Sequence, residues 1–440
     1  MKIEPKLSQL AEYAWQGELD LYHEFHPVER RFPDAEQLSD RALWFKGIAS
    51  ATAVDTGDGL VMLDTGARQD TEILYSEVRK WSRAPLSFAV FSHHHLDHIF
   101  GMGPFEREAE DRDWSPPVVY AHELLPDNFD RYKRTRGLQK AINSRQFSSV
   151  MPDFEMSRDF EWPVDYRYPD RTYRNQIVLK QGDLTFELNH ARGETEDHTW
   201  TWVPELELLH PGDLFIWAVP NAGNPQKYQR FPGEWASALR SMAAKGAGTL
   251  LPGHGLPIFG HNRVEEALTA TAELLEFIEH STVSLMNHGL SLDAILERIT
   301  VPDYLSSKPY LQTVYDHPDF IVRNVWRLYG GWYEGEPDRL LPAPRRLEAA
   351  EWIDLSGGVE QVAERVEQLV ETRDYRLACH LAEALVLADP DSRAIHELRA
   401  QTYRARAETE TSTMARYILL HAAYSSDLGV RDMAEGTLGD

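Results

Sequence analysis

Four potential metal ligands stand within six residues of this chain, in the pattern H-x-H-x-D-H that runs from His93 through His95 and Asp97 to His98. The apolar run Leu86–Phe91 precedes them, as a buried parallel strand does where its carboxyl end opens into a loop. Ligands at the end of a buried strand have a rigid base and face a crevice. Imidazole and carboxylate ligands without thiolate suit zinc first, with manganese or iron as alternatives. A histidine-rich surface loop is the other interpretation, and the set spacing after a strand argues against it.

Further acidic and histidine residues follow this cluster in a fixed order. Glu194 comes directly after a glycine, Asp213 lies in the run Pro-Gly-Asp-Leu-Phe, and His254 lies in Pro-Gly-His-Gly. The interval between the two acids is 213 − 194 = 19 residues. Upstream, Asp64 stands in the run Val-Met-Leu-Asp-Thr-Gly. Together with the histidine cluster, these segments resemble the signature of the metallo-β-lactamase superfamily.

That resemblance implies a set of seven ligands for two ions. One ion would be held by His93, His95 and Glu194, the other by Asp97, His98 and His254, with Asp213 shared between them. An anionic bridge is needed because two dications about 3.5–4 Å apart repel each other, and the pair turns a bound water into a hydroxide nucleophile near neutral pH. In the superfamily, the aspartate that corresponds to Asp64 orients ligands and does not bind metal.

His198 has the residue type of a ligand but the wrong spacing. Its interval to Asp213 is 213 − 198 = 15 residues, four short of the usual one. We therefore expect His198 to orient a ligand or to act as a general acid, and we expect it to take part in catalysis together with Asp97. A histidine satisfied by backbone groups is the alternative. His94 should point away from its two neighbours on an extended backbone.

Glutamate in the third-ligand position narrows the resemblance to the alkyl sulfatase branch, which also uses acidic residues there. The arginine- and tyrosine-rich stretch 128–147 and the stretch 315–335 are similar to segments of those enzymes, and in the first we expect Arg131, Tyr132 and Arg136 to contact the substrate. The loop 217–231 departs from the branch, because it has no histidine for the sulfate group. Asn224, Lys227 and Arg230 of that loop are candidates to hold an oxyanion, since guanidinium groups suit its bidentate geometry; a solvated face is the alternative.

The composition limits the classes of partner. A chain of 440 residues with 42% hydrophobic and 11% aromatic residues has enough apolar material for more than one packed domain. Its formal net charge of −25 has no basic block, which argues against nucleic-acid binding. Such a field repels anions at long range. A small anionic ester substrate would therefore depend on local arginines and on the two cations inside the pocket.

The single cysteine, Cys379, excludes an intramolecular disulfide and is expected to be a buried structural thiol. The N-terminal sequence lacks a basic segment followed by an apolar one, and no stretch approaches the ~20 apolar residues of a membrane span. We expect a cytoplasmic protein without a membrane span.

The arrangement of apolar residues predicts two regions. Residues up to about 270 alternate short β-rich runs with turns, among them Ala51–Asp64, Leu86–Ser92 and Thr199–Leu209. After a proline-rich linker near 334–346, the runs Val359–Thr372, Tyr375–Ala388 and Ser392–Glu408 have helical spacing. The prediction is an α/β fold, an αββα metallo-β-lactamase sandwich over residues 1–335 with an insertion at about 124–165, followed by an all-α tetratricopeptide-like domain over residues 345–440. In alkyl sulfatases the corresponding helical domain mediates dimerisation, so the resemblance implies a homodimer; the alternative is a helical array that only caps its own catalytic domain.

These inferences favour a binuclear metal-dependent hydrolase of alkyl sulfate esters, with two zinc ions as its cofactor. The same metal pair can activate water against phosphoesters, lactones or β-lactams, so a hydrolase of those esters is the nearest alternative. A noncatalytic dimeric scaffold, whose metal site is purely structural and closed to water, is the alternative from a different class.

Overall fold

The structure of the chain is a computed structural model that describes residues 6–29, 35–147 and 161–435. It divides into two compact units, one formed by Met1–Lys133 and Val164–Trp332 and the other by Arg134–Pro163 and Tyr333–Asp440. Residues 148–160 of the insertion expected from the sequence lie outside the described part. The domain boundaries given above remain a prediction.

The first unit contains a seven-stranded sheet in the described part of the chain, with the strands in sequence order. The first four strands pair antiparallel and the last four pair parallel. β4 and most of β5 are buried, as expected for apolar parallel strands covered on both faces. The strands are β1 (Ala35–Ser39), β2 (Ala42–Lys46), β3 (Ser50–Asp55), β4 (Leu60–Leu63), β5 (Leu86–Val90), β6 (Val118–His122) and β7 (Arg171–Tyr173).

A second sheet of six strands lies in the same unit, in the order β13-β12-β11-β10-β9-β8. Its pairs are antiparallel except for β11 with β12. Burial alternates along β9, and its buried Phe186 meets Phe88 of the first sheet with ring centroids 5.4 Å apart. The strands are β8 (Gln176–Gln181), β9 (Leu184–Ala191), β10 (His198–Val203), β11 (Leu208–His210), β12 (Thr249–Leu250) and β13 (Ile258–Phe259).

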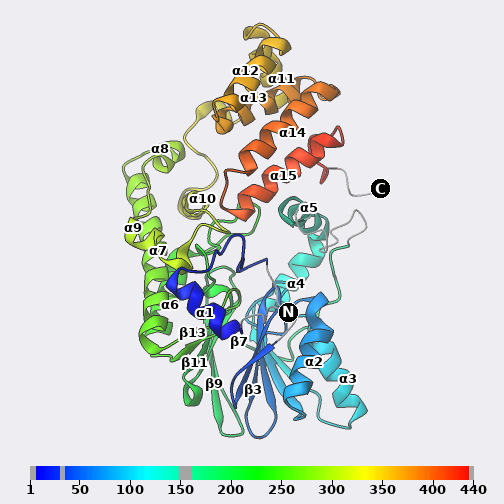
Figure 1. The fold of residues 1–440 in the computed structure, drawn as a ribbon, viewed down its shortest axis with the longest axis vertical. Coiled ribbons are helices and arrows are strands. Elements are labelled where there is room, and N and C mark those ends of the chain that lie inside the picture. Colours follow the sequence, from blue (N-terminus) through cyan, green and yellow to red (C-terminus); the bar gives the residue numbers. More distant parts are fainter. Residues whose placement is uncertain (1–5, 30–34, 148–160, 436–440) are drawn as a thin grey trace. The chain divides into compact units, whose positions relative to one another are not determined.

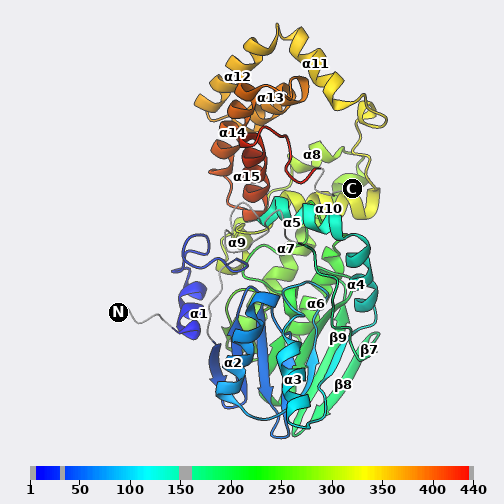
Figure 2. The same ribbon diagram turned by 90° about the vertical axis from the view of Figure 1, so that its right-hand side faces the viewer.

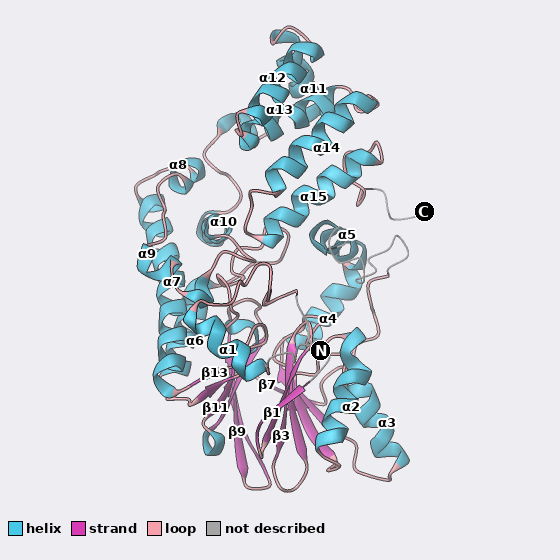
Figure 3. Ribbon diagram, in the orientation of Figure 1, coloured by secondary structure: helices cyan, strands magenta, loops and turns pink. Residues whose placement is uncertain are grey.

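Helices cover the outer faces of the two sheets. Figures 1 and 3 show α2 (Thr71–Trp81) and α3 (Met102–Asp111) on the side of the first sheet, and α6 (Pro232–Ala243) and α7 (His261–Asn287) on the side of the second. Each helix buries one apolar stripe, as with Leu74 and Val78 of α2. The further helices of this unit are α1 (Leu7–Gln16), α4 (Leu125–Arg134), α8 (Leu292–Leu296), α9 (Asp303–Ser306) and α10 (Pro318–Gly330).

This arrangement confirms the predicted αββα sandwich. Two of the predicted β-rich runs contain more than one strand. Ala51–Asp64 consists of β3 and β4 joined by a tight turn, and Thr199–Leu209 consists of most of β10 and the start of β11. The parallel strands β4, β5 and β6 end at one edge of the first sheet. β5 is followed there directly by the histidine cluster.

The second unit is helical in its described part (Figure 2). Val366, Leu385, Val386 and Ile395 belong to its apolar core. The three predicted helical runs correspond to α12, α13 and α14, and the side chain of Ser392 caps α14 by accepting from the Ile395 amide. α5, α11 and α15 were not predicted as helices. The helices are α5 (Arg136–Phe147), α11 (Arg345–Leu355), α12 (Val359–Glu371), α13 (Tyr375–Ala388), α14 (Arg393–Ala407) and α15 (Thr413–Asp427).

α5 joins the C-terminal helices through a polar contact with the segment that follows α15. Arg145 Nε donates to Asp432 Oδ2 at 2.8 Å, and His421 Nε2 lies 2.9 Å from Asp432 Oδ1. Cys379 of α13 is buried, as predicted. Across residues 6–29, 35–147 and 161–435, none of the helices has both the length and the apolar character that a bilayer crossing requires.

Candidate metal centre

The seven residues expected to bind metal come from loops at the ends of strands in both sheets. His93, His95, Asp97 and His98 follow β5 of the first sheet. The other three come from the second sheet, where Glu194 lies between β9 and β10, Asp213 follows β11, and His254 follows β12. The short parallel pair β11 and β12 places the last two loops side by side.

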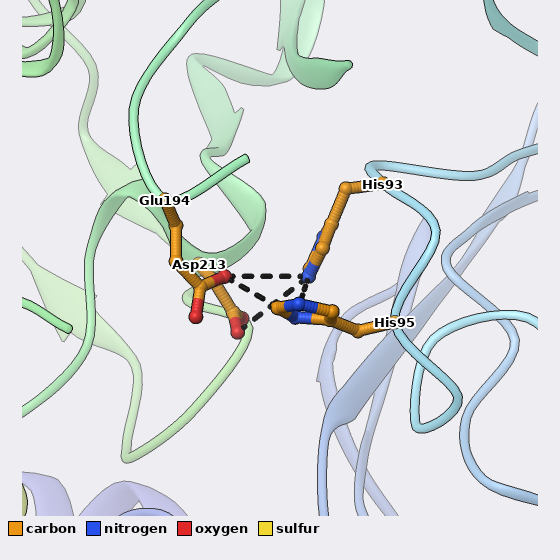
Figure 4. A group of neighbouring side chains, drawn as sticks. All are labelled: His93, His95, Glu194 and Asp213. Carbon is orange, nitrogen blue, oxygen red and sulfur yellow. Dashed lines mark hydrogen bonds and ion pairs between the residues drawn. The ribbon is translucent and has the colours of Figure 1, made fainter. Parts of the chain in front are cut away.

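Four of these side chains form the first group, with one potential ligand atom from each within 4.8 Å of the others. His93 Nε2 and His95 Nδ1 are 2.8 Å apart, and both lie 3.4 Å from Glu194 Oε2. Asp213 Oδ2 is 3.8 Å from His93 Nε2. Figure 4 shows the two imidazoles facing the two carboxylates across this point.

Asp97, His98 and His254 form the second group. His254 Nε2 lies 3.2 Å from Asp97 Oδ2 and 3.3 Å from Asp213 Oδ2, and His98 Nε2 lies 3.3 Å from Asp213 Oδ1. Asp213 therefore contacts both groups. The structure brings together all seven residues that the sequence analysis assigned to the metal site.

Contacts behind the site fix which ring nitrogen faces it. The buried carboxylate of Asp64 accepts from Ser92 N at 2.7 Å, from Ser92 Oγ at 2.8 Å and from His98 Nδ1 at 2.7 Å. Because Ser92 Oγ donates to Asp64, its oxygen accepts from His93 Nδ1 at 2.9 Å. His254 Nδ1 donates to the carbonyl of Ile48 at 2.9 Å. In all three histidines Nε2 is thus left as the nitrogen that points into the site, as expected for metal ligands.

The chemistry of these donors fits a divalent cation. His98 Nε2, Glu194 Oε2 and Asp213 Oδ1 are buried atoms that make no hydrogen bond with any described residue. Buried polar atoms without hydrogen-bond partners are costly, and a positive ion in each ligand group would stabilise them. Imidazole nitrogens and carboxylate oxygens are the ligand types of Zn²⁺, Mn²⁺ and Fe²⁺ sites.

Electrostatics separate the histidines into two kinds. Burial and the neighbouring imidazoles hold the pKa of His93 well below its usual value, and burial and His94 do the same for His95. Burial would also lower the pKa of His98, but Asp213, Asp64 and Asp97 outweigh it and raise that pKa well above its usual value. The pKa of His254 is raised in the same way to about 9, against burial, chiefly by Asp213. In the metal-free protein, protons on His98 and His254 thus balance the carboxylates.

The acidic ligands also differ from each other. Burial raises the pKa of Glu194 to about 7, although Arg230 opposes the shift. The pKa of Asp213 is held well below its usual value, because His254 and His98 outweigh the effect of burial. Protonation of Glu194 near neutral pH relieves its repulsion with Asp213 in the absence of a cation.

Close backbone approach shapes the loop that carries Asp213. Gly212 has φ +54°, and a Cβ there would come within 2.6 Å of His198 Nε2 and 2.8 Å of Ser92 Cβ. A Cβ on Gly253 would come within 2.1 Å of Asp213 Oδ1. Glycine is therefore required at both positions.

His198 lies behind Asp213 and not among the ligand atoms of either group. Its Nε2 accepts from the Asp213 amide at 3.2 Å, and its ring stacks on His93 with centroids 4.4 Å apart. Burial lowers the pKa of His198 to about 4. These contacts favour the orienting role expected for His198 over the role of a general acid, since Nε2 is occupied by an amide donor.

Arg230 extends from the loop 217–231 to the first ligand group. Its side chain is buried, donates to the Glu194 carbonyl, and lies 3.7 Å from Glu194 Oε1. Its Nε is buried and makes no hydrogen bond to any described residue. Burial and the repulsion of Arg230 lower the pKa of the nearby Lys227 to about 8. Asn224 is buried, and its Oδ1 accepts from the Gln226 amide at 3.0 Å, which stabilises the turn of this loop.

Of the three residues predicted in the insertion, two lie in α4 near the ligand loops. Tyr132 is buried with its ring 4.9 Å from that of His94. Arg131 donates to Glu196 Oε1 at 2.8 Å and stacks over Tyr228 at 4.2 Å. Arg136 is exposed at the start of α5, which belongs to the other unit. Substrate contact by these three residues remains a prediction.

Several residues near the site were not singled out from the sequence. Lys46 of β2 is fully buried and donates to the carbonyls of Gly47 at 2.8 Å and Ile48 at 3.0 Å, so it stabilises the carbonyl that orients His254. Asn221 donates to Glu194 Oε1. Asp316, whose pKa burial raises to about 7, accepts from the Gly223 amide at 2.6 Å. Of these residues, only Asn221 could have been found from the sequence, because it lies in the loop that follows the proposed ligand Asp213.

A sandwich of two mixed sheets between helices, with histidines and carboxylates gathered at its strand ends, defines the class of metallo-β-lactamase-fold proteins. Residues 44–254 match the family model of the metallo-beta-lactamase superfamily, and residues 291–429 match that of alkyl sulfatase dimerisation. Residues 44–254 thus form a domain of the metallo-β-lactamase superfamily, and residues 291–429 form an alkyl sulfatase dimerisation domain. The family predicted from the sequence is thereby confirmed.

Relatives of the chain are named alkylsulfatases. A linear primary-alkylsulfatase from a Pseudomonas species is 27% identical over 364 residues, which are 80% of this chain and 69% of the relative. An (R)-specific secondary-alkylsulfatase from Pseudomonas is 24% identical over 80% of this chain and 56% of its own length. The chain thus spans just over two thirds of the first relative and little more than half of the second.

A solved structure has the same fold. The structure of a stereoselective inverting sec-alkylsulfatase from Pseudomonas matches 90% of this chain and 66% of its own with a TM-score of 0.79, at 20% sequence identity.

Metal binding to this site should release protons and strengthen as the pH rises. At pH 7 a histidine with a pKa of about 9, such as His254, carries a proton that a metal ion must displace. For each proton displaced, the apparent affinity should rise by up to about tenfold per pH unit while the pH is below that pKa. Competition for Zn²⁺ against a chromophoric chelator between pH 6 and 8.5, corrected for the chelator's own protonation, measures this dependence. A constant affinity over that range would contradict the assignment of His254 as a ligand.

Proposed function

We propose that the chain is a metal-dependent hydrolase of alkyl sulfate esters that holds two zinc ions, with manganese or iron as alternatives. The observation that carries the proposal is the position of Asp213, whose carboxylate contacts both ligand groups. A single ion would leave one group of buried ligands without a cation. The names of the relatives supply the substrate class.

The ligand sets follow from the two groups. His93, His95 and Glu194 would hold one ion, Asp97, His98 and His254 the other, and Asp213 both. Ions in these positions would acidify a bound water and polarise an ester oxygen, which is the chemistry that paired divalent cations supply. The chain's own residues orient these groups, since Asp64, Ser92, Ile48 and Lys46 fix the imidazoles from behind.

The anionic end of the substrate would be bound by the loop 217–231. Arg230 and Lys227 are the cations that this loop brings near Glu194. Arg230 Nε is buried and makes no hydrogen bond with the described residues, so it can donate to a sulfate oxygen. An anion beside Lys227 would also raise its lowered pKa and keep its amine charged. Arg131, Tyr132, Arg136 and Asn224 remain candidates for further substrate contacts.

Loss of Asp97 tests the catalytic proposal. Zinc-loaded protein should release sulfate from primary or secondary alkyl sulfates, and Asp97→Ala, which removes a ligand of the second group, should lower the rate by at least about 10²-fold. The matched control is Asp58→Ala, because Asp58 is exposed in the turn between β3 and β4.

Ion chromatography of released sulfate, beside assays of phosphate and lactone substrates, measures the outcome. Sulfate release that is equal in parent and Asp97→Ala would reject the metal mechanism. Release from phosphate or lactone esters alone would replace the alkyl sulfatase by the broader ester hydrolase. If two ions bind tightly and no ester is hydrolysed, the noncatalytic scaffold is the correct interpretation.

Removal of the lysine charge tests substrate binding. Lys227→Gln should raise KM for an alkyl sulfate by about 10–100-fold and change kcat much less, because a charge-assisted hydrogen bond of roughly 1.5–3 kcal/mol is lost mainly from the bound ground state. Lys227→Arg should keep most of the affinity. Lys180→Gln, at an exposed position of β8, is the control. Steady-state kinetics decide the matter, and an unchanged KM would remove Lys227 from the substrate site.

We also propose that the chain forms a homodimer through its C-terminal helical unit. The family model for alkyl sulfatase dimerisation matches residues 291–429. Large apolar side chains are exposed there on α11 and just before it, including Leu341 at 92%, Trp352 at 61% and Leu355 at 70%. Trp352 and Leu355 are three residues apart and share one face of the helix. Neighbouring exposed apolar side chains of this size commonly mark a site of protein–protein interaction.

The dimer proposal is tested by replacing this face. Trp352→Ser with Leu355→Ser should shift the sedimentation coefficient from dimer to monomer at micromolar concentration. Leu428→Ser, at an exposed leucine after α15, should leave it unchanged. A parent chain that sediments as a monomer would contradict the dimer itself. The cytoplasmic location expected from the sequence stays a prediction.

A further inference from the structure

His94 and Asp197 form a buried pair directly behind the first ligand group. His94 Nδ1 lies 2.9 Å from Asp197 Oδ1, and neither side chain has more than 4% of its surface exposed. Neither residue is among the ligand atoms of the two groups. The pair joins the loop that follows β5 to the segment between β9 and β10, two segments that are 103 residues apart in sequence.

The position of each partner relates it to specific ligands. His94 stands between His93 and His95 in the sequence, and its Nδ1 faces Asp197 and not the ligand atoms. Asp197 is three residues after Glu194 and just before β10. The bond between His94 and Asp197 therefore restrains the backbone of the two histidine ligands relative to the backbone of the glutamate ligand. It does so without placing a further side chain among the ligand atoms.

The segment that carries Glu194 needs such a restraint. It is the connection between the antiparallel strands β9 and β10, and hairpin connections are by default the more mobile parts of a sheet. A backbone bond from Thr199 N to Ser92 O, 2.7 Å long, ties the start of β10 to the same ligand loop. The pair of His94 and Asp197 extends this tie two residues closer to Glu194.

Energetics make the pair a strong restraint. A fully buried carboxylate without a partner is destabilised by desolvation, so Asp197 is stable where it lies only while a donor remains close. Burial alone would raise the pKa of Asp197, but the interactions with His94, and to a smaller extent with Thr195 and His198, outweigh burial and hold that pKa well below its usual value. Tyr132 packs its ring against His94 and limits the rotation of the imidazole.

We propose that His94 and Asp197 are a positioning pair that delivers Glu194 to the ion held by His93 and His95, and so sets the affinity of the first of the two metal positions. The inference rests on the proposed function only in requiring that this group of ligands binds metal. It assigns a role to two residues outside the ligand set.

The test is a double-mutant cycle read out by metal affinity. His94→Ala and Asp197→Ala should each weaken Zn²⁺ binding at one of two positions by about 10–100-fold, as loss of an orienting partner of a ligand does elsewhere. The double variant should be no weaker than either single variant, because one bond is lost in all three. His94→Asn, whose side-chain amide can stand in for Nδ1–H, should recover most of the affinity. Chelator competition gives the affinities, and the absorption spectrum of Co²⁺-loaded protein reports the coordination of each position.

A matched pair elsewhere in the chain separates positioning from general stability. His421 and Asp432 of the helical unit form a similar bond of 2.9 Å, far in sequence from any proposed ligand. His421→Ala should lower the melting temperature and leave both Zn²⁺ affinities within about twofold of the parent. If His94→Ala and Asp197→Ala behave as His421→Ala does, or if their effects on affinity multiply in the double variant, the proposal is wrong.

The same experiment distinguishes this inference from the proposed function. A parent that binds no Zn²⁺ would overturn both, because no ion would then occupy the first position. A parent that binds two ions without hydrolysing sulfate esters would overturn the proposed substrate and leave the positioning pair to be judged by its own cycle. Where Asp197→Ala fails to fold, Asp197→Leu, which is similar in size and has no hydrogen-bond acceptor, takes its place in the cycle with the same expected loss.

Discussion

A buried carboxylate, that of Asp64, is the constraint on which the site depends. It accepts hydrogen bonds from the backbone and side chain of Ser92 and from His98, and His210 Nε2 lies 3.2 Å away. Burial would raise the pKa of Asp64, but these interactions outweigh it, so the group stays ionised where no water reaches it. Because Ser92 Oγ, which donates to Asp64, accepts from His93 Nδ1, the carboxylate of Asp64 orients one histidine in each ligand group.

The same charges explain how an acidic ligand set accommodates an anionic substrate. Asp97, Glu194 and Asp213 contribute −3 and two divalent ions would contribute +4, which gives −3 + 4 = +1 for the filled centre. A histidine at position 194 would leave +2. The glutamate thus lowers the positive charge available to a sulfate group. Arg230, which contacts Glu194 directly, and Lys227 supply positive charge beside the centre within a chain whose net charge is −25.

The sequence predicted well which side chains the fold brings together, because candidate ligands are recognised by residue type at fixed spacing after strands. His93, His95, Asp97 and His98 follow one strand, and Glu194, Asp213 and His254 lie at strand ends that a mixed sandwich brings to one edge. The supports of these ligands were not predictable in that way. Lys46 and Asp197 act through partners in segments whose proximity exists only after folding. His198 had the right residue type, and only the contact with the Asp213 amide shows which side of the ligand it occupies.

The prediction of secondary structure was incomplete where the apolar periodicity of a helix is weak and where a long segment was treated as one element. In α15, the buried stripe of Met414, Tyr417, His421 and Ser425 mixes apolar with polar side chains, so its apolar residues alone do not mark one face of a helix. The insertion was treated as one piece, although α4 carries Tyr132 to the ligand loops while α5 belongs to the helical unit. Adjacency in sequence does not reveal that a chain passes from one compact unit to another at a single turn.

Each ligand group draws its members from both sheets, and this has a consequence for the sandwich itself. The first group joins the loop after β5 to the loops around β10 and β11, and the second joins the loop after β5 to the loop after β12. An ion in either group would act as a cross-link that closes a long loop of chain between its ligands, which removes conformational freedom from the unfolded state. The edge of the sandwich that gathers the proposed ligands would thus also be the edge at which bound ions join its two halves. At the opposite edge the halves are joined by the ion pair of Arg41 with Asp183 and by the hydrogen bond from Gln181 Nε2 to the Asp58 carbonyl.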